Sequence, residues 1–75
     1  MKEDTFTFTA IAIDGTFEID FAVRNTTKLS LVARSIVQRQ GIREIMIYVD
    51  GHPIKDYSLP CEVLIGAGEV TVDYS

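Results

Sequence analysis

The chain has 75 residues, of which 47% are apolar and 24% charged, and its formal net charge is −4 at pH 7. A chain of this length makes a single domain, 1–75, close to the size at which one hydrophobic core is only just sufficient. The negative charge argues against a nucleic-acid-binding protein and against a protein that binds acidic membrane surfaces.

The cysteine content and the start of the chain predict a cellular compartment. Cys61 is the single cysteine, so no internal disulfide can form and a reducing compartment is expected. We interpret its side chain as an ordinary, half-buried thiol. Lys2-Glu3-Asp4 is followed by alternation rather than by the apolar run of a signal peptide, and no stretch approaches the roughly 20 apolar residues that cross a bilayer. These features predict a cytoplasmic protein with no membrane partner.

The first third of the chain predicts a β-hairpin. Asp14-Gly15 stands between two alternating segments, which is typical of a two-residue turn with φ > 0 at both positions. Counting outward from this turn places Phe8 opposite Phe21. Directly opposed residues share one side of a sheet, so Ile11 and Ile13 fall on a mostly polar side. The opposite, apolar side consists of Phe6, Phe8, Ala10, Ala12, Phe17, Ile19, Phe21 and Val23.

A helix is predicted over about 27–40, because apolar residues recur there at i, i+3, i+4, i+7 and i+8. Thr26 or Thr27 is expected to cap its N-terminus, and Gly41 stands where a helix C-terminal glycine belongs. Leu31 lies off the apolar stripe, on the polar side of the helix.

The second half of the chain predicts two further strands, over 44–50 and 69–74, with an irregular crossing between them. Residues 50–53 mark a turn. Residues 55–57 are expected to add a short edge segment, and 58–60 to begin a single helical turn with a proline near its start. The whole pattern describes an α+β domain with one helix packed across a mixed sheet of four to five strands.

This pattern resembles the β-grasp fold and, within it, the ubiquitin-like superfamily. The resemblance is carried by the spacing of Leu29, Val32, Ile36, Gly41-Ile42, Ile47-Tyr48-Val49-Asp50-Gly51, Ile54, Leu59, Leu64 and Val70. It implies a first strand that lies centrally and parallel to the last, with the second and third strands at the edges. The immunoglobulin-binding domains of streptococcal surface proteins share the hairpin–helix–hairpin plan, but segment 51–68 departs from them.

Chemical signatures of the β-grasp families are not found in the sequence. Modifiers and sulfur carriers of this fold finish in an activated Gly-Gly tail, whereas the present sequence finishes at Asp73-Tyr74-Ser75. Conjugation and sulfur-carrier chemistry are therefore not expected. The clustered cysteines of β-grasp ferredoxins are absent as well.

The remaining candidate residues for chemistry stand alone in the sequence. His52, the single histidine, has no second histidine beside it and is interpreted as a turn residue. Gly66-Ala67-Gly68 lacks the lysine and Ser/Thr of a phosphate-binding loop. We therefore expect no enzyme activity, no catalytic residues, no metal and no cofactor.

Two surfaces are candidates for binding a protein partner of unknown identity. The first is the outer face of the sheet, where four apolar side chains approach the size of a patch that needs a partner, and where the resemblance also implies the binding patch. Its residues are Ile11, Ile13, Met46, Tyr48 and Thr71. The second is a basic span without any acid, suited to guiding an acidic protein partner. Its cations are Arg24, Lys28, Arg34, Arg39 and Arg43.

Two classes of function follow from these surfaces. One is a non-catalytic protein-binding module or small regulator that uses the exposed sheet face. The other is a structural or assembly subunit that self-associates through the sheet face or an edge strand. Each surface also has an explanation without a partner. The apolar residues of the sheet face can be ordinary exposed strand residues with high β-propensity, and the basic residues can form a solvated helix face. Nucleic acid is not expected as a partner, because the basic span lacks interleaved aromatic residues.

Overall fold

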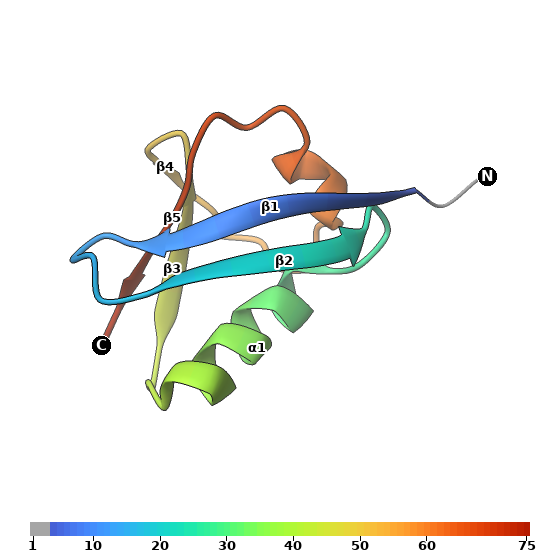
Figure 1. Cartoon of the computed structure of the whole chain (residues 1–75). Coiled ribbons are helices and arrows are strands. Elements are labelled where there is room, and N and C mark those ends of the chain that lie inside the picture. The colour runs from blue at the N-terminus through green and yellow to red at the C-terminus, as the bar shows by residue number, and fades with distance from the viewer. Residues whose placement is uncertain (1–3) are drawn as a thin grey trace.

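The computed structural model of the chain describes residues 4–75. Lys2-Glu3, part of the charged start of the chain, lies outside the described residues. The elements in chain order are β1 (Thr5–Ala12), β2 (Glu18–Arg24), α1 (Leu29–Gln40), β3 (Ile45–Val49), β4 (His52–Pro53), the 3-10 helix η1 (Cys61–Leu64) and β5 (Val70–Tyr74). Within residues 4–75 the strands form one five-stranded sheet in the order β2-β1-β5-β3-β4 (Figure 1).

The sheet is mixed, and the helix packs against one face of it. Strands β1 and β5 lie in the interior and pair in parallel, while the other neighbouring strands pair antiparallel. This confirms the α+β prediction, including the parallel first and last strands. The prediction that the third strand forms an edge is wrong, because the two-residue strand β4 pairs with it on the outside.

The register of the β1–β2 hairpin is the predicted one, with Phe8 opposite Phe21. The predicted two-residue turn is wrong. The Ala12 N–H donates to the Phe17 carbonyl at 3.0 Å, so the loop spans 13–16, and Asp14 is not a position of positive φ. The alternation of apolar residues therefore sets the pairing without help from that turn type.

The turn with φ > 0 at both positions occurs at the second Asp-Gly dipeptide of the chain. Asp50 has φ +50° and Gly51 has φ +83°, and they connect β3 to β4 at the Val49–His52 pair. These signs are those of the two-residue turn whose twist matches the twist of antiparallel strands. The hairpin signal was therefore correct for this dipeptide and incorrect for the first one.

Asp14 stabilises the β1–β2 loop through its side chain. Its carboxylate accepts hydrogen bonds from the Thr16 hydroxyl (2.7 Å), the Thr16 N–H (3.1 Å) and the Tyr74 hydroxyl (2.8 Å). These donors, with the Thr16 hydroxyl first, lower the pKa of Asp14 below its ordinary value of 3.8. The loop is thereby tied to the end of β5.

We expect the stabilising effect of Asp14 to depend on pH. Because the folded pKa lies below 3.8, the carboxylate stabilises the fold above pH 3.8 and loses this effect as the pH falls through the folded pKa. An NMR titration of the Asp14 carboxyl should give a midpoint below 3.8, and Thr16→Val should move the midpoint upward. A wild-type midpoint at or above 3.8 would contradict the hydrogen bonds described.

The start of α1 differs from the prediction. The helix begins at Leu29 after Lys28, whose side chain makes no capping hydrogen bond, so the predicted caps Thr26 and Thr27 are wrong. The N–H groups of Leu29 and Ser30 instead donate to the carbonyls of Leu59 and Tyr57, both at 2.9 Å. At the other end, Gly41 adopts the predicted left-handed conformation (φ +64°) and donates to the Val37 carbonyl.

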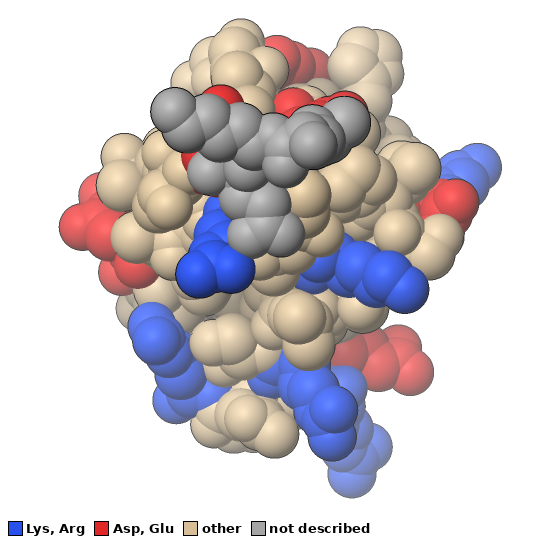
Figure 2. All heavy atoms as spheres, turned by 90° about the vertical axis from the view of Figure 1, so that its right-hand side faces the viewer, with Lys and Arg blue, Asp and Glu red and all other residues tan. Residues whose placement is uncertain are grey.

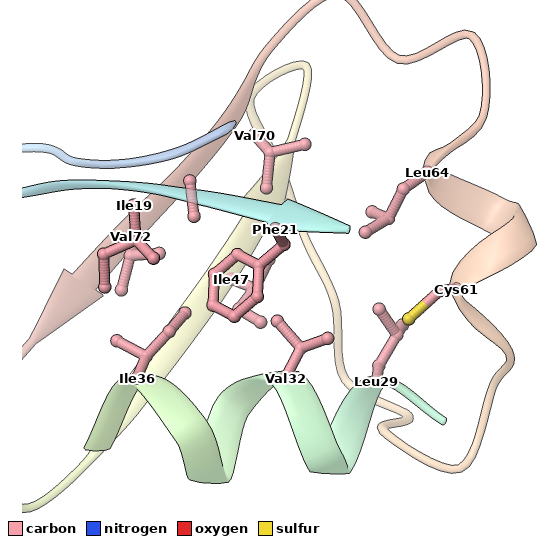
Figure 3. Packing of buried hydrophobic residues seen from close by; sticks show 11 residues of the cluster. Ile19, Phe21, Leu29, Val32, Ile36, Ile47, Cys61, Leu64, Val70 and Val72 are labelled. Carbon is pink, nitrogen blue, oxygen red and sulfur yellow. The ribbon is translucent and has the colours of Figure 1, made fainter. Parts of the chain in front are cut away.

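The core lies between α1 and the inner face of the sheet (Figure 3). Its most deeply buried side chains, at 0–1% exposure, include Leu29, Ile36, Ile47 and Val72. Cys61 is fully buried rather than half-buried as predicted, and its sulfur points toward Leu29 in Figure 3. Burial raises the pKa of the Cys61 thiol above its usual value, so the thiol stays protonated at neutral pH and serves as an apolar core group.

Segment 51–68 also differs in detail from the prediction. The edge strand is β4 at His52–Pro53, so the edge segment predicted at 55–57 is wrong. The predicted single helical turn exists as η1, but it begins directly after Pro60 and has no side-chain cap. The Ser58 hydroxyl donates to the Asp56 carboxylate instead.

Candidate protein-binding face

The register of three adjacent strands aligns three of the predicted binding residues. Ile11 of β1 is paired with Thr71 of β5, and Thr71 is paired with Tyr48 of β3. Opposed residues project from the same face of a sheet. Ile11, Thr71 and Tyr48 therefore form one row across the outer face, and Pro53 of β4 extends this row beyond Tyr48.

The other two predicted residues lie along the neighbouring row. Met46 of β3 is paired with Asp73 of β5. Ile13 follows directly after β1, and its N–H donates to the Val72 carbonyl at 2.9 Å. Continuing the parallel register by one residue places Ile13 beside Asp73, so an acid separates Ile13 from Met46. The sequence prediction left Asp73 out of the site, although the alternation of β5 already placed it on this face.

The apolar side chains of this face are exposed to solvent. Ile13 is 60% exposed, Ile11 38% and Met46 37%, while Tyr48 and Thr71 are half-buried. The inner face of the same strands packs against α1 (Figure 1). The structure thus brings all five predicted residues onto one helix-free surface, which we call the outer face.

Acidic side chains surround the apolar residues of the outer face. Glu18 is paired with Ile11 at the β2 side, Asp20 accepts a hydrogen bond from the Thr9 hydroxyl at 2.7 Å, and Asp73 lies between Ile13 and Met46. All three acids are exposed. A protein surface that covers this face would be complementary if it offered apolar side chains framed by lysine or arginine.

The basic residues predicted as a second surface are all exposed, but they do not share one stripe of the helix. Arg34 and Arg39 are five positions apart, which corresponds to about 140° around a helix. Arg39 turns toward β2, with its guanidinium carbon 5.6 Å from the centre of the Phe21 ring. Figure 2 shows most of the visible Lys and Arg in the lower half of the molecule, at the level of α1 in Figure 1.

The two side chains with potential for catalysis lie in different environments. His52 is exposed in β4, and Cys61 is buried in η1. Within residues 4–75, no group of three His, Cys, Asp or Glu side chains is placed to hold a metal ion. None of the helices in this part of the chain has the length and apolar character needed to span a bilayer.

Sequence reasoning missed one apolar surface. Leu59 and Val63 are 39% and 42% exposed, and they border an open hollow of about 520 Å³ together with His52 and Ile54. Leu59 precedes η1 and Val63 lies within this four-residue 3-10 helix, and both belong to segment 51–68, which is too irregular for strand or helix periodicity to apply. The exposure of Leu59 and Val63 was therefore not readable from the sequence.

Comparisons with known proteins identify the fold. No protein-family model and no curated protein matches the sequence. A solved structure of a ubiquitin-like protein from Trypanosoma brucei aligns with a TM-score of 0.61 and 14% sequence identity, covering 96% of this chain and 94% of that chain. Both chains are thus covered nearly end to end by one architecture. The chain has the β-grasp fold of the ubiquitin-like proteins.

Proposed function

We propose that this protein is a non-catalytic protein-binding module, and that the outer face binds its partner. One observation carries the proposal: the sheet register gathers Ile11, Ile13 and Met46, all exposed, with Tyr48 and Thr71 on the side without a helix.

The energetics of exposed apolar groups support this proposal. Apolar side chains that stay in water contribute little to the free energy of folding. Their burial against a partner stabilises the complex by about 25 cal/mol per Å² of apolar surface, before the costs of association are subtracted. Tyrosine and methionine are also enriched at the centres of protein interfaces. The acidic rim of Glu18, Asp20 and Asp73 favours a partner that presents basic residues around an apolar centre.

The environment of Cys61 supports a role without catalysis. A nucleophilic cysteine needs a lowered pKa and access to substrate. The Cys61 thiol is fully buried and its pKa is raised. The hydrogen-bonded Asp14 carboxylate lies at an exposed loop and has a lowered pKa, the opposite of what a general acid at neutral pH requires.

We expect Ile11→Thr to reduce partner binding by about fivefold or more, a loss of roughly 1 kcal/mol. The substitution keeps a β-branched residue suited to a strand but removes apolar area from the centre of the outer face. The measurement is affinity capture on immobilised protein from extracts of its native cells, with the retained proteins quantified by mass spectrometry.

The matched control is Leu59→Thr. Leu59 is exposed to the same extent as Ile11 (39% against 38%) but precedes η1 and lies outside the outer face. A partner should be retained by the wild type and by Leu59→Thr, and depleted with Ile11→Thr. Equal retention by all three proteins would show that the outer face is not the binding surface.

A further inference from the structure

Strand β1 is paired on both of its sides only in its second half. The pairing with β2 covers β1 from Thr5 onward, whereas the parallel register with β5 is confined to residues 10–12 of β1. Within residues 4–75, no strand pairs with the first half of β1 on the β5 side. β1 is therefore an interior strand at one end and an edge strand at the other.

The first half of β1 presents unpaired backbone groups on the β5 side. The Ala12 N–H donates to the Phe17 carbonyl, and antiparallel hydrogen bonds alternate along a pair of strands. Even-numbered residues of β1 therefore bond to β2, and odd-numbered residues direct their backbone groups the other way. Among residues 4–75, the N–H and C=O of Thr7 and the N–H of Thr9 have no backbone partner. An extended segment that lies along this side can bond to them.

Hydrogen bonds hold the neighbouring segment away from β1. Before β5, the Asp50 N–H donates to the Glu69 carbonyl at 2.9 Å, and the Glu69 N–H donates to the Asp50 carboxylate at 2.8 Å. The Ala67 N–H donates to the Leu64 carbonyl at 3.1 Å. The segment between η1 and β5 is thereby tied to η1 and to the β3–β4 turn, and Figure 1 shows it arching away from β1. It therefore does not continue the β5 ladder along β1.

A hollow of about 450 Å³ lies between the first half of β1 and this segment. We call it the notch, and it is lined by residues 6–9, 11 and 64–70. Phe6 and Phe8 are half-buried there, although they belong to the apolar side of the hairpin. Ile65 lines the notch as well and is 56% exposed. The notch thus combines unpaired backbone groups with uncovered apolar side chains.

We propose that the notch binds an extended peptide segment of a partner protein, which adds to the sheet as a short strand antiparallel to the first half of β1. The central residue of the peptide lies opposite Thr7 and exchanges two N–H···O=C hydrogen bonds with it. Its two neighbours lie opposite Phe6 and Phe8. Their side chains project to the apolar side of the sheet, where burial against Ile65 favours apolar residues.

The charges at the two ends of the notch specify the peptide further. Glu69 lines the notch beside β5, and Asp4 precedes β1 at the other end. Both acids are exposed. Lysine or arginine at both ends of the peptide complements them. The chemistry that fits the notch is therefore an extended basic segment with two apolar residues around a small polar one.

This inference does not rest on the proposed function. Of the five residues assigned to the outer face, Ile11 alone also lines the notch. The unpaired backbone groups belong to Thr7 and Thr9, and the apolar wall to Phe6, Phe8 and Ile65. The tests below therefore leave Ile11 unchanged.

The first test is amide hydrogen exchange of the wild type, followed by NMR. Without peptide, the Thr7 amide should exchange much faster than the Phe8 amide, which bonds within the β1–β2 pair. The probe is the peptide acetyl-Lys-Val-Ser-Val-Thr-Lys-amide, whose serine lies opposite Thr7 and whose last lysine lies opposite Asp4. In excess, it should slow exchange at Thr7 by about tenfold or more.

Two results of this measurement would overturn the proposal. One is a Thr7 amide that without peptide is already as protected as the Phe8 amide, whether by the chain itself or by a second copy. The other is an unchanged exchange rate at Thr7 in the presence of millimolar peptide.

The second test uses the wild-type protein with altered peptides, so a loss of folding cannot account for its result. Methylation of the serine nitrogen removes the N–H that bonds to the Thr7 carbonyl and should raise the dissociation constant by about tenfold. The matched control is methylation of the last lysine nitrogen, whose N–H points away from β1 and whose loss should change little. Equal dissociation constants for the two methylated peptides, measured by NMR titration, would overturn strand addition.

The third test locates the peptide on the protein. Ile65 and Leu31 are each 56% exposed, but of the two Ile65 lines the notch and Leu31 does not. Ile65→Thr should weaken peptide binding by about threefold or more, because it removes apolar area from the wall. Leu31→Thr should bind like the wild type. Equal affinities of the two variants would overturn the proposed position.

Tyr48→Ala separates the notch from the outer face. This variant should bind the peptide with the wild-type dissociation constant, although it is expected to lose the partner of the outer face. Loss of peptide binding in Tyr48→Ala would place the peptide on the outer face and overturn the inference. Failure of either proposal is therefore recognised without reference to the other.

Discussion

Replacing Phe21 with alanine is expected to lower the free energy of unfolding by about 3–5 kcal/mol. Phe21 is 8% exposed, its ring stacks on Phe8 with centroids 5.2 Å apart, and the Arg39 guanidinium lies over it. The truncation opens a cavity between β2 and α1 within the core. A domain of this size has a total stability of about 4–11 kcal/mol, so the variant should be close to unfolding. Urea denaturation of the wild type and the variant measures the effect.

Phe17→Ala is the control for this stability prediction. Phe17 is half-buried beside the β1–β2 loop, and its ring contacts Tyr74 in a tilted arrangement at 5.5 Å. Its truncation removes apolar burial at the margin of the core and should cost clearly less than Phe21→Ala. Equal losses for the two variants, or a loss below about 1 kcal/mol for Phe21→Ala, would contradict the described packing.

Tyr48→Ala is expected to weaken partner binding by about 2 kcal/mol or more, as for a hot-spot residue. Tyr48 lies in the middle of the outer face, between Thr71 and Pro53 in the cross-strand row. The free energy of unfolding should change by no more than about 1 kcal/mol, because Tyr48 lies on the solvent side of the sheet and is not part of the buried core. Isothermal titration calorimetry measures this loss of binding free energy. The titrant is the partner protein that the wild type captures and that is depleted with Ile11→Thr.

Charge reversal on α1 distinguishes the outer face from the basic residues of the helix. Arg34→Glu and Arg39→Glu should leave the affinity of the outer face nearly unchanged and should mainly alter the rate of association and its dependence on salt, as expected for charges outside the contact. Normal binding by Tyr48→Ala together with loss of the complex in Arg39→Glu would show that the helix surface is the binding site.

The faces of the strands could be predicted from the sequence because they depend on apolar alternation. Moving Phe21 to the solvent side would expose it together with Ile19 and Val23, an energetic penalty larger than any turn preference. That is why the register was correct although the loop at Asp14 was not. The alternation of apolar and polar residues is enough to determine the strand register. The conformation of the loop depends instead on the Thr16 and Tyr74 hydroxyls, which donate hydrogen bonds to Asp14.

The start of the helix could not be predicted, because its hydrogen-bond acceptors come from elsewhere in the chain. The local rule looks for a Ser or Thr side chain before the helix. Here the carbonyls of Leu59 and Tyr57 accept the first N–H groups of the helix. Contacts over such a sequence distance follow from the tertiary structure alone, and the same holds for the Tyr57 hydroxyl, which accepts a hydrogen bond from the Ile47 N–H of β3.

The composition of the outer face was predicted more fully than its environment. Alternation placed Ile11 and Met46 on the solvent side, where the structure has them. It could not reveal that Tyr48 is half-buried, because this depends on Thr71 and Pro53 in the neighbouring strands. The acidic rim was within reach of the sequence, because the predicted hairpin places Glu18 and Asp20 on the same side as Ile11, and the alternation of β5 places Asp73 there as well.

The central claim is that the outer face binds a protein, and amide chemical-shift mapping of the labelled chain with the captured partner tests it most directly. We expect the largest shifts at residues 11, 13, 46, 48 and 71, with small changes along α1. Shifts concentrated between Arg34 and Arg39, with the outer face unchanged, would contradict the proposal.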